Sequence, residues 1–290
     1  MKYVDGRPSG VFGFKLKLTA VILVFLILVS IVYIWAEQNT LALNVYNVET
    51  QKLNTSVKVA LISDLHNKEF GRDNERLVRK IAEQKPDFIA IVGDMNTDTN
   101  PDYSVMIKLL KQLVEISPVY YVPGNHEATV ADESNIVQDI RATGVTYLSN
   151  EGIFFEKNGE KLYIGGLKQY PYFEFDYPEF DNPERHFFDS FREIQKEYFS
   201  ILLCHQPECY MWSLSEYDID LMLSGHTHGG LVRIPFIGGL RAPNQKWFPE
   251  YDKGEFFSGT ARMIITGGLG DTHIIPRINN TPEVCIININ

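Results

Sequence analysis

The chain has 290 residues, of which 44% are hydrophobic and 22% are charged. These fractions are ordinary for a globular protein, and the length suffices for one large domain or two small ones with a buried core. The formal net charge of -10 argues against a nucleic-acid-binding surface, which needs a basic face, although a bound dication can still supply positive charge for phosphate chemistry. The three cysteines, Cys204, Cys209 and Cys285, form no Cys-x-x-Cys pair, and we expect buried thiols.

Residues 18–36 form an uncharged apolar run, close to the ~20 residues that a helix needs to cross the hydrocarbon layer of a membrane. Residues 1–17 contain four basic side chains against one acidic side chain. The positive-inside rule therefore predicts a single-pass protein of the cell membrane, with a cytoplasmic N-terminus and an extracytoplasmic domain. The alternative is a cleaved signal peptide, but its apolar region is usually ~7–15 residues, and the longer run favours an uncleaved anchor.

After a polar linker over residues 37–55, strand and helix patterns alternate in chain order. Apolar, β-branched runs predict strands, and apolar residues at helical spacing predict helices. The strands are expected at 57–66, 87–94, 119–127, 199–206 and 219–226, the helices at 74–84, 103–117, 133–141 and 207–217, and a hairpin with an Asn158-Gly159 turn at 152–167. The pattern beyond Gly229 predicts short strands. We expect one domain over residues 56–290, with a two-sheet core and helices packed outside.

Metal-competent side chains follow five of these predicted strands. Because sites in α/β sheets form where the carboxyl ends of strands converge, the side chains are expected to meet at one edge. Each short motif alone is weak evidence for a functional site, but the five motifs in this order are specific evidence. The fragments are Asp64-x-His66, Gly93-Asp94, Gly124-Asn125-His126-Glu127, His205 and Gly225-His226-x-His228.

The last fragment belongs to the stretch LSGHTHGG, residues 223–230, which has three interpretations: metal ligands, an acid/base pair, or polar residues of a tight turn. Carboxylate, amide and imidazole donors suit hard or borderline dications, whereas soft metals favour thiolates. Seven such residues suit two metals that share a bridging carboxylate. We therefore interpret the two histidines as metal ligands.

These motifs, in this order, resemble the signature of the calcineurin-like metallophosphoesterase superfamily. The stretch LSGHTHGGLVRIPFIGG, together with the N-terminal apolar run, resembles its membrane-anchored bacterial phosphodiesterase branch. The resemblance covers the chain from about Val57 to the C-terminus. It implies an α/β fold, a four-layer α/β/β/α sandwich of two mixed sheets flanked by helices, here with an N-terminal transmembrane helix. The protein Ser/Thr phosphatase branch has an Arg soon after Gly-Asp and another after Gly-Asn-His-Glu. Neither GDMNTDTN nor GNHEATV contains an Arg, which argues against a protein phosphatase.

The resemblance also assigns roles to individual residues. It implies two divalent metal ions, of Mn, Fe, Zn or Mg, and a catalytic His126 that is not a ligand. Glu127 and Asp98 are expected to support the site from behind, by orienting a ligand or His126. The implied ligands are Asp64, His66, Asp94 and His228 for one metal, and Asp94, Asn125, His205 and His226 for the other.

The expected activity is hydrolysis of a phosphodiester or pyrophosphate bond by a hydroxide that bridges the metals. A membrane anchor raises the effective concentration near the bilayer, which favours an envelope or lipid-linked phosphoester as substrate. The alternatives are a phosphomonoesterase that uses the same site, and a non-catalytic module that binds metal or an envelope polymer.

Overall fold

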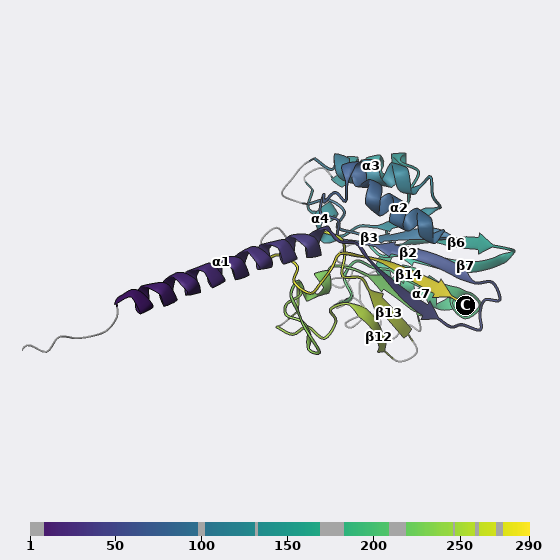
Figure 1. Ribbon diagram of the computed structural model, residues 1–290. Coiled ribbons are helices and arrows are strands. Elements are labelled where there is room, and N and C mark those ends of the chain that lie inside the picture. The colour runs from purple at the N-terminus through teal and green to yellow at the C-terminus, as the bar shows by residue number, and fades with distance from the viewer. Residues whose placement is uncertain are drawn as a thin grey trace, which may run out of the picture.

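The computed structural model describes residues 9–97, 102–130, 133–168, 183–208, 219–245, 247–258, 261–270 and 275–290. The chain begins with a long helix, α1 (Ser9–Asn39), that projects from one end of the domain (Figure 1). Its segment Phe14–Asn39 is long and apolar enough to cross a membrane, by length and composition, and no part of its apolar window is buried in the domain. The predicted run 18–36 lies within this helix.

The first of two large sheets has six strands in the order β1-β14-β2-β3-β4-β5. The strands β2 to β5 are parallel, β14 is antiparallel to β2, and β1 is parallel to β14, so the sheet is mixed. The strand bounds are β1 (Ala42–Val48), β2 (Val57–Ile62), β3 (Phe88–Val92), β4 (Val119–Val122), β5 (Thr146–Tyr147) and β14 (Glu283–Ile289).

The edge strand β1 lies in the stretch 37–55, for which the sequence predicts a linker. Every residue of β1 is paired with β14, from Ala42 opposite Glu283 to Val48 opposite Ile289. Its partner strand comes from the far end of the chain, so neither a turn nor a neighbouring motif marks the pairing. Most of the stretch 37–55 is therefore part of α1 and of the sheet rather than a tether.

The second sheet has the order β12-β13-β9-β8-β7-β6 and is also mixed, because β6–β7 and β12–β13 are antiparallel and the inner pairs are parallel. Asn158 and Gly159 form the predicted two-residue turn between β6 and β7, with φ of 53° and 84°. A two-stranded hairpin, β10 (Arg233–Ile234) with β11 (Gly238–Gly239), stands apart. The strand bounds of this second sheet are β6 (Glu151–Lys157), β7 (Glu160–Gly166), β8 (Phe199–Leu203), β9 (Leu221–Ser224), β12 (Gly254–Ser258) and β13 (Ala261–Ile265).

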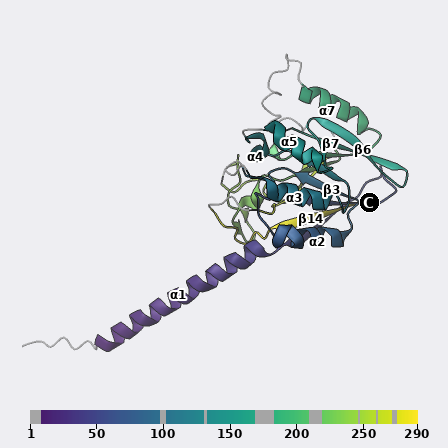
Figure 2. The same ribbon diagram turned by 90° about the horizontal axis from the view of Figure 1, so that it is seen from above.

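The two sheets pack face to face, and helices cover their outer faces (Figure 2). Apolar side chains from both sheets, such as Val59 and Leu61 with Ile201 and Leu223, form the central core. On the outer face of the first sheet lie α2 (Glu75–Gln84), α3 (Ser104–Leu113) and α5 (Glu133–Ala142), and on that of the second lies α7 (Pro183–Ile194). The predicted four-layer sandwich is confirmed. Cys204 and Cys285 are buried free thiols, and Cys209 lies outside the described residues.

Candidate metal centre

All seven residues expected to bind metal gather where strands of both sheets end. The carboxyl ends of β2, β3 and β4 in the first sheet deliver Asp64, His66, Asp94 and Asn125, the last of which opens the short helix α4 (Asn125–Ala128). The ends of β8 and β9 in the second sheet deliver His205, His226 and His228, the last of which begins the 3-10 turn η3 (His228–Gly230). Potential ligand atoms of the acidic and histidine residues lie within 4.8 Å of one another in three overlapping groups: Asp64, His66 and His228; His66, Asp94 and His126; Asp94, His205 and His226.

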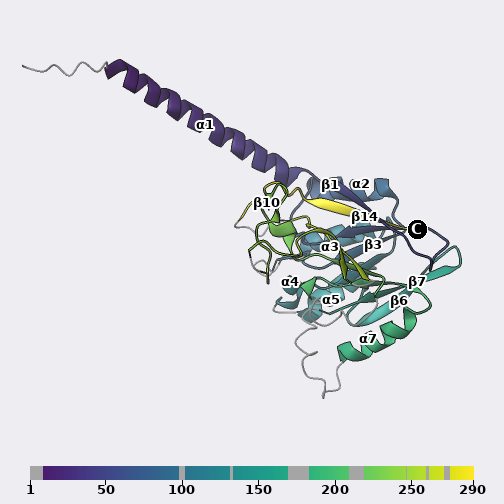
Figure 3. The ribbon, with the colours of Figure 1, turned by 90° about the horizontal axis from the view of Figure 1, so that it is seen from below.

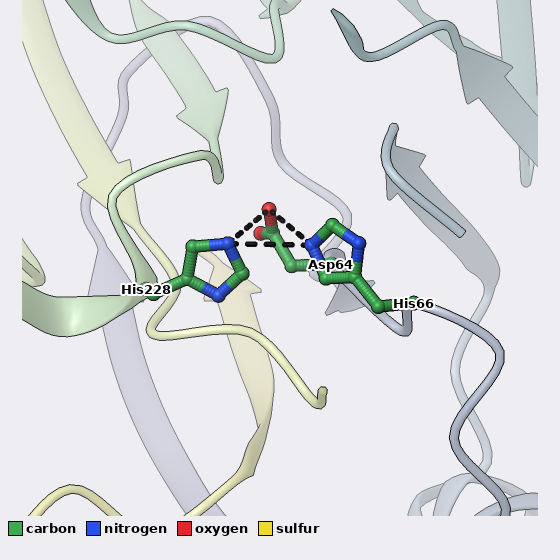
Figure 4. Close-up of side chains that lie close together, drawn as sticks. All are labelled: Asp64, His66 and His228. Atoms are coloured by element: carbon green, nitrogen blue, oxygen red, sulfur yellow. Dashed lines mark hydrogen bonds and ion pairs between the residues drawn. The ribbon is translucent and has the colours of Figure 1, made fainter. Parts of the chain in front are cut away.

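The first group is shown in Figure 4. The Nε2 atoms of His66 and His228 face each other at 3.3 Å. Oδ1 of Asp64 lies 4.0 Å from Nε2 of His66 and 3.7 Å from Nε2 of His228, so three buried donor atoms surround one small space. The Asp64 carboxylate is held in place by the backbone N–H of His226, 3.1 Å from Oδ2.

The second group is built around Asp94 and His205. Nε2 of His205 lies 3.1 Å from Oδ2 of Asp94 and 3.2 Å from both Oδ1 of Asn125 and Nδ1 of His226. Oδ2 of Asp94 also lies 3.8 Å from Nε2 of His126. Asp94 therefore contributes an oxygen to two adjacent groups, the position that a bridging carboxylate requires.

Burial keeps most of the imidazoles in this centre neutral. It lowers the pKa of His66 to about 4 and that of His226 to about 3, and it lowers the pKa of His228 well below the usual value. For His205 burial acts in the same direction, but the Asp94 carboxylate outweighs it and raises the pKa to about 10. Burial likewise opposes the charge of Asp94, yet the adjacent His205 holds the pKa of that carboxyl below its usual value. Burial raises the pKa of Asp64 to about 6.

In His205 and His226, a hydrogen bond at one ring nitrogen determines that the other nitrogen faces the centre. Nδ1–H of His205 donates to the Val92 carbonyl at 2.6 Å, so Nε2 is the nitrogen that faces Asp94 and that can bind a cation once it loses its proton. The side-chain amide of Asn244 lies 3.0 Å from Nε2 of His226. An amide can turn either its oxygen or its nitrogen to this atom. With its oxygen facing His226, Asn244 accepts a hydrogen bond from Nε2–H, and Nδ1 is then the nitrogen with a free lone pair for a metal.

Sequence reasoning missed Asn244 and also Arg277. The Arg277 side chain is fully buried, donates from Nε to the Gly270 carbonyl at 2.8 Å, and places Nη2 3.5 Å from Nδ1 of His228. Both residues come from turns beyond the last motif, where no strand pattern or residue spacing points toward the centre. Only the folded chain brings them to it.

Glu127, for which the sequence predicts a supporting role, lies behind the centre and contacts the backbone after the strand ends rather than a ring. Its carboxylate accepts the backbone N–H groups of Asp94 and Gly124, each at 2.8 Å, and that of Met95 at 2.7 Å. The Tyr121 hydroxyl donates to the same carboxylate at 2.8 Å. The loops after β3 and β4 are thus tied together through one buried side chain. The other expected supporting residue, Asp98, lies outside the described residues.

The backbone of the centre is strained. Five of the seven expected ligand residues have a positive φ, which for residues other than glycine is sparsely populated and costs on the order of 1–3 kcal/mol each. Such strain persists only where the surrounding structure over-determines it, and it is concentrated at functional sites. The five residues and their φ values are Asp64 (53°), His66 (49°), Asp94 (53°), His226 (68°) and His228 (50°).

The donor set fits divalent cations. Imidazole nitrogens and carboxylate oxygens converge at buried points. His205 is the charged ring among them, and its Nε2 proton lies where a cation would neutralise Asp94. The described donors are nitrogen and oxygen, as hard or borderline dications favour.

Comparison with known proteins agrees with the site. The family described as calcineurin-like phosphoesterase matches residues 57–230, more than half of the chain. The chain is 27% identical over 259 residues to the uncharacterized protein YpbG of Bacillus subtilis, covering 89% of this chain and 90% of that protein. It is also 27% identical to the B. subtilis metallophosphoesterase YkuE, over 80% of this chain and 78% of that one. It is 28% identical to the phosphodiesterase YaeI of Escherichia coli, over 80% and 82% respectively.

The chain therefore belongs to the calcineurin-like phosphoesterase family. It is a metal-dependent phosphoester hydrolase, and members of the family use two divalent metals, for which the three side-chain groups contain candidate donors.

Proposed function

We propose that the chain is a membrane-anchored hydrolase of phosphodiester or pyrophosphate bonds, acting on an envelope or lipid-linked substrate outside the cytoplasmic membrane. The observation that carries the proposal is the convergence of seven nitrogen and oxygen donors from five strand ends, centred on Asp94. The similarity to YaeI, a phosphodiesterase, supports the diester preference. We assign the cations as the sequence implies, one to Asp64, His66, Asp94 and His228, the other to Asp94, Asn125, His205 and His226.

When bound, two divalent cations would lower the pKa of a water nucleophile and neutralise charge on the phosphate oxygens. The chain's own residues then supply proton transfer. As water attacks phosphorus and the bond to the leaving oxygen breaks, His126 donates a proton to that oxygen. Its side chain is 25% exposed, against 5% or less for the four other histidines at the strand ends, so it faces the side from which substrate enters. Asp94 fixes it by accepting the His126 backbone N–H at 2.8 Å.

The helix α1 supports the anchor. None of its apolar window is buried in the domain, and the basic residues of 1–17 favour a cytoplasmic N-terminus. A diester or pyrophosphate substrate carried by a lipid would then lie in the same bilayer as the anchor. Residues 56–290 are the catalytic domain in this proposal.

The experiment is a hydrolysis screen of the full chain in detergent, with diesters, monoesters and lipid pyrophosphates against Mn, Fe, Zn and Mg ions. His126→Ala is expected to lower kcat by about 10²–10⁴-fold, because general acid catalysis contributes that much, while the metal content stays unchanged. The matched control is His186→Ala on the exposed surface of α7. Unchanged turnover in His126→Ala would favour a non-catalytic binding role, and faster turnover of monoesters than of diesters would favour the phosphomonoesterase.

A further inference from the structure

The helix α1 joins the domain at the end where α4 lies, and α4 begins with Asn125 of the metal centre (Figure 1). Only two residues separate the end of α1 at Asn39 from the start of β1 at Ala42. Ala42 is paired with Glu283 in β14, and two residues further on Cys285 is paired with Leu61 in β2. The amino end of β1 is therefore level with the carboxyl end of β2, the strand that delivers Asp64.

The last turns of α1 are fastened to the loops around this end. The Tyr33 hydroxyl donates to Oδ1 of Asn279 at 2.7 Å, and Nδ2 of Asn279 donates to the Arg233 carbonyl, at the start of β10, at 3.2 Å. One turn later Oε1 of Glu37 accepts the Thr281 hydroxyl at 2.8 Å. Hydrogen bonds thus hold the end of the helix against the domain, and we call this contact the joint.

The length of the apolar run determines where the joint lies relative to the hydrocarbon layer of the membrane. A helix rises 1.5 Å per residue, so residues 18–36 extend about 28 Å, and the hydrocarbon layer is about 30 Å thick. Nearly the whole run is needed to cross, which places Tyr33 and Trp35 at the outer boundary of the hydrocarbon layer. Because Tyr33 is bonded to Asn279, the loops at this end of the domain lie at the membrane surface too.

Those loops expose large apolar side chains, which we name the apolar tip: Phe236, Ile237, Trp247 and Phe248. Phe236 and Ile237 form the turn of the β10–β11 hairpin, and Figure 3 shows β10 beside the domain end of α1. Trp247 and Phe248 belong to the neighbouring loop, which is paired to the hairpin's continuation through Phe248 N–H and the Leu240 carbonyl at 2.9 Å. Aromatic side chains with a nearby cation are typical of membrane interfaces, and the Arg241 guanidinium lies 5.8 Å from the Trp247 ring centre.

The loop that carries Trp247 also forms part of the metal centre. Asn244, three residues before Trp247, contacts Nε2 of His226 at 3.0 Å. A loop resting in the membrane surface would therefore set the distance between the metal centre and the lipid headgroups.

We propose that the apolar tip inserts into the outer surface of the bilayer that α1 crosses, so that the metal centre opens toward the headgroup layer. The substrates are then phosphoesters of amphiphiles embedded in that bilayer, reached without extraction into water. This inference rests on the proposed function for its anchor and its chemistry, and the bilayer is the partner because α1 already holds the tip against it.

The test uses the full chain in vesicles of phosphatidylethanolamine and phosphatidylglycerol. An environment-sensitive fluorophore is attached at Phe236→Cys, in a background with Cys209→Ser, since Cys204 and Cys285 are buried. Glu156→Cys, exposed near the β6–β7 turn at the opposite end of the second sheet, is the matched control. We expect blue-shifted emission and strong quenching by brominated acyl chains at position 236, and neither at position 156. Emission at position 236 that is as water-like as at 156 would overturn the inference.

A kinetic arm separates this inference from the proposed function. The double variant Phe236→Ser, Trp247→Ser is compared with Phe257→Ser, an exposed residue of β12 outside the tip. We expect a higher KM for a vesicle-embedded phosphodiester in the double variant alone, and little change for a soluble diester with the same headgroup. If the wild-type chain hydrolysed no phosphoester while position 236 lay in lipid, the proposed function would fail and the docking would stand. If it hydrolysed both diesters while position 236 lay in water, the docking would fail and the hydrolase function would stand.

Discussion

The carboxylate of Glu127 is the contact on which the geometry of the metal centre depends most, and Glu127→Gln is the substitution that tests it. The side chain is 2% exposed and accepts four backbone N–H groups, one of them at 3.4 Å, and the Tyr121 hydroxyl. Glutamine has the same shape but keeps only one acceptor oxygen. Its amide nitrogen would face donors in either orientation. At one position these are the N–H groups of Asp94 and Gly124, and at the other they are the N–H groups of Met95 and Asn96 and the Tyr121 hydroxyl.

Two short hydrogen bonds to a charged acceptor, of 2.7–2.8 Å, are lost in either orientation. Each contributes about 1.5–3 kcal/mol, so the expected loss in the free energy of unfolding is about 3–6 kcal/mol. For a domain of this size about 1 kcal/mol lowers Tm by 2–4 °C, which predicts a decrease of roughly 6–24 °C. Because Glu127 holds the backbone of Asp94, we also expect metal affinity to fall by about 10–100-fold.

The assay is thermal denaturation of the full chain in detergent, followed by metal titration of the folded variant. Tyr121→Phe is the control, because it removes one of the five hydrogen bonds and leaves the carboxylate in place. We expect it to lower Tm by about half as much as Glu127→Gln. If the two variants denatured at the same temperature, or if Glu127→Gln bound metal as tightly as the wild type, the role assigned to Glu127 would be refuted.

Two further predictions concern the ligands. His205 is protonated in the metal-free chain below pH 10 and must lose that proton to offer Nε2, so at neutral pH metal binding should release about one proton and tighten about tenfold per pH unit. Calorimetry in buffers of different ionisation enthalpy measures this release, and a pH-independent affinity would contradict it. Asn244→Ala should weaken metal binding by about 10–100-fold in competition with a chelator, because His226 loses its orienting partner. Asn54→Ala, which removes an amide bonded to Glu160 in β7, should leave metal binding as in the wild type.

The sequence predicts the donor atoms of the centre well because each one follows a strand with a recognisable apolar pattern. Asp64, Asp94 and His205 are placed by the rule that the carboxyl ends of parallel strands meet at one edge, and the structure confirms this convergence. Their metal-binding roles remain predictions until an ion is observed.

The features that the sequence does not predict depend on pairing between distant strands and on turns. The strand β1 pairs with the last strand of the chain, and its neighbours in sequence carry no sign of that partner. Asn244 and Arg277 reach the centre from turn-rich segments in which hydrogen bonds with distant residues, rather than local periodicity, fix the backbone. The position of α1 at the same end of the domain as the metal centre likewise depends on register. It follows from the pairing of β1 with β14 and of β14 with β2.

The bridging position of Asp94 between two cations can be observed by anomalous diffraction from crystals of the full chain loaded with Mn²⁺. We predict two peaks about 3.5–4 Å apart, one beside Asp64, His66 and His228 and the other beside His205 and His226, with Asp94 in contact with both. A single peak, or a pair of peaks that Asp94 does not join, would contradict a two-metal centre built on this carboxylate.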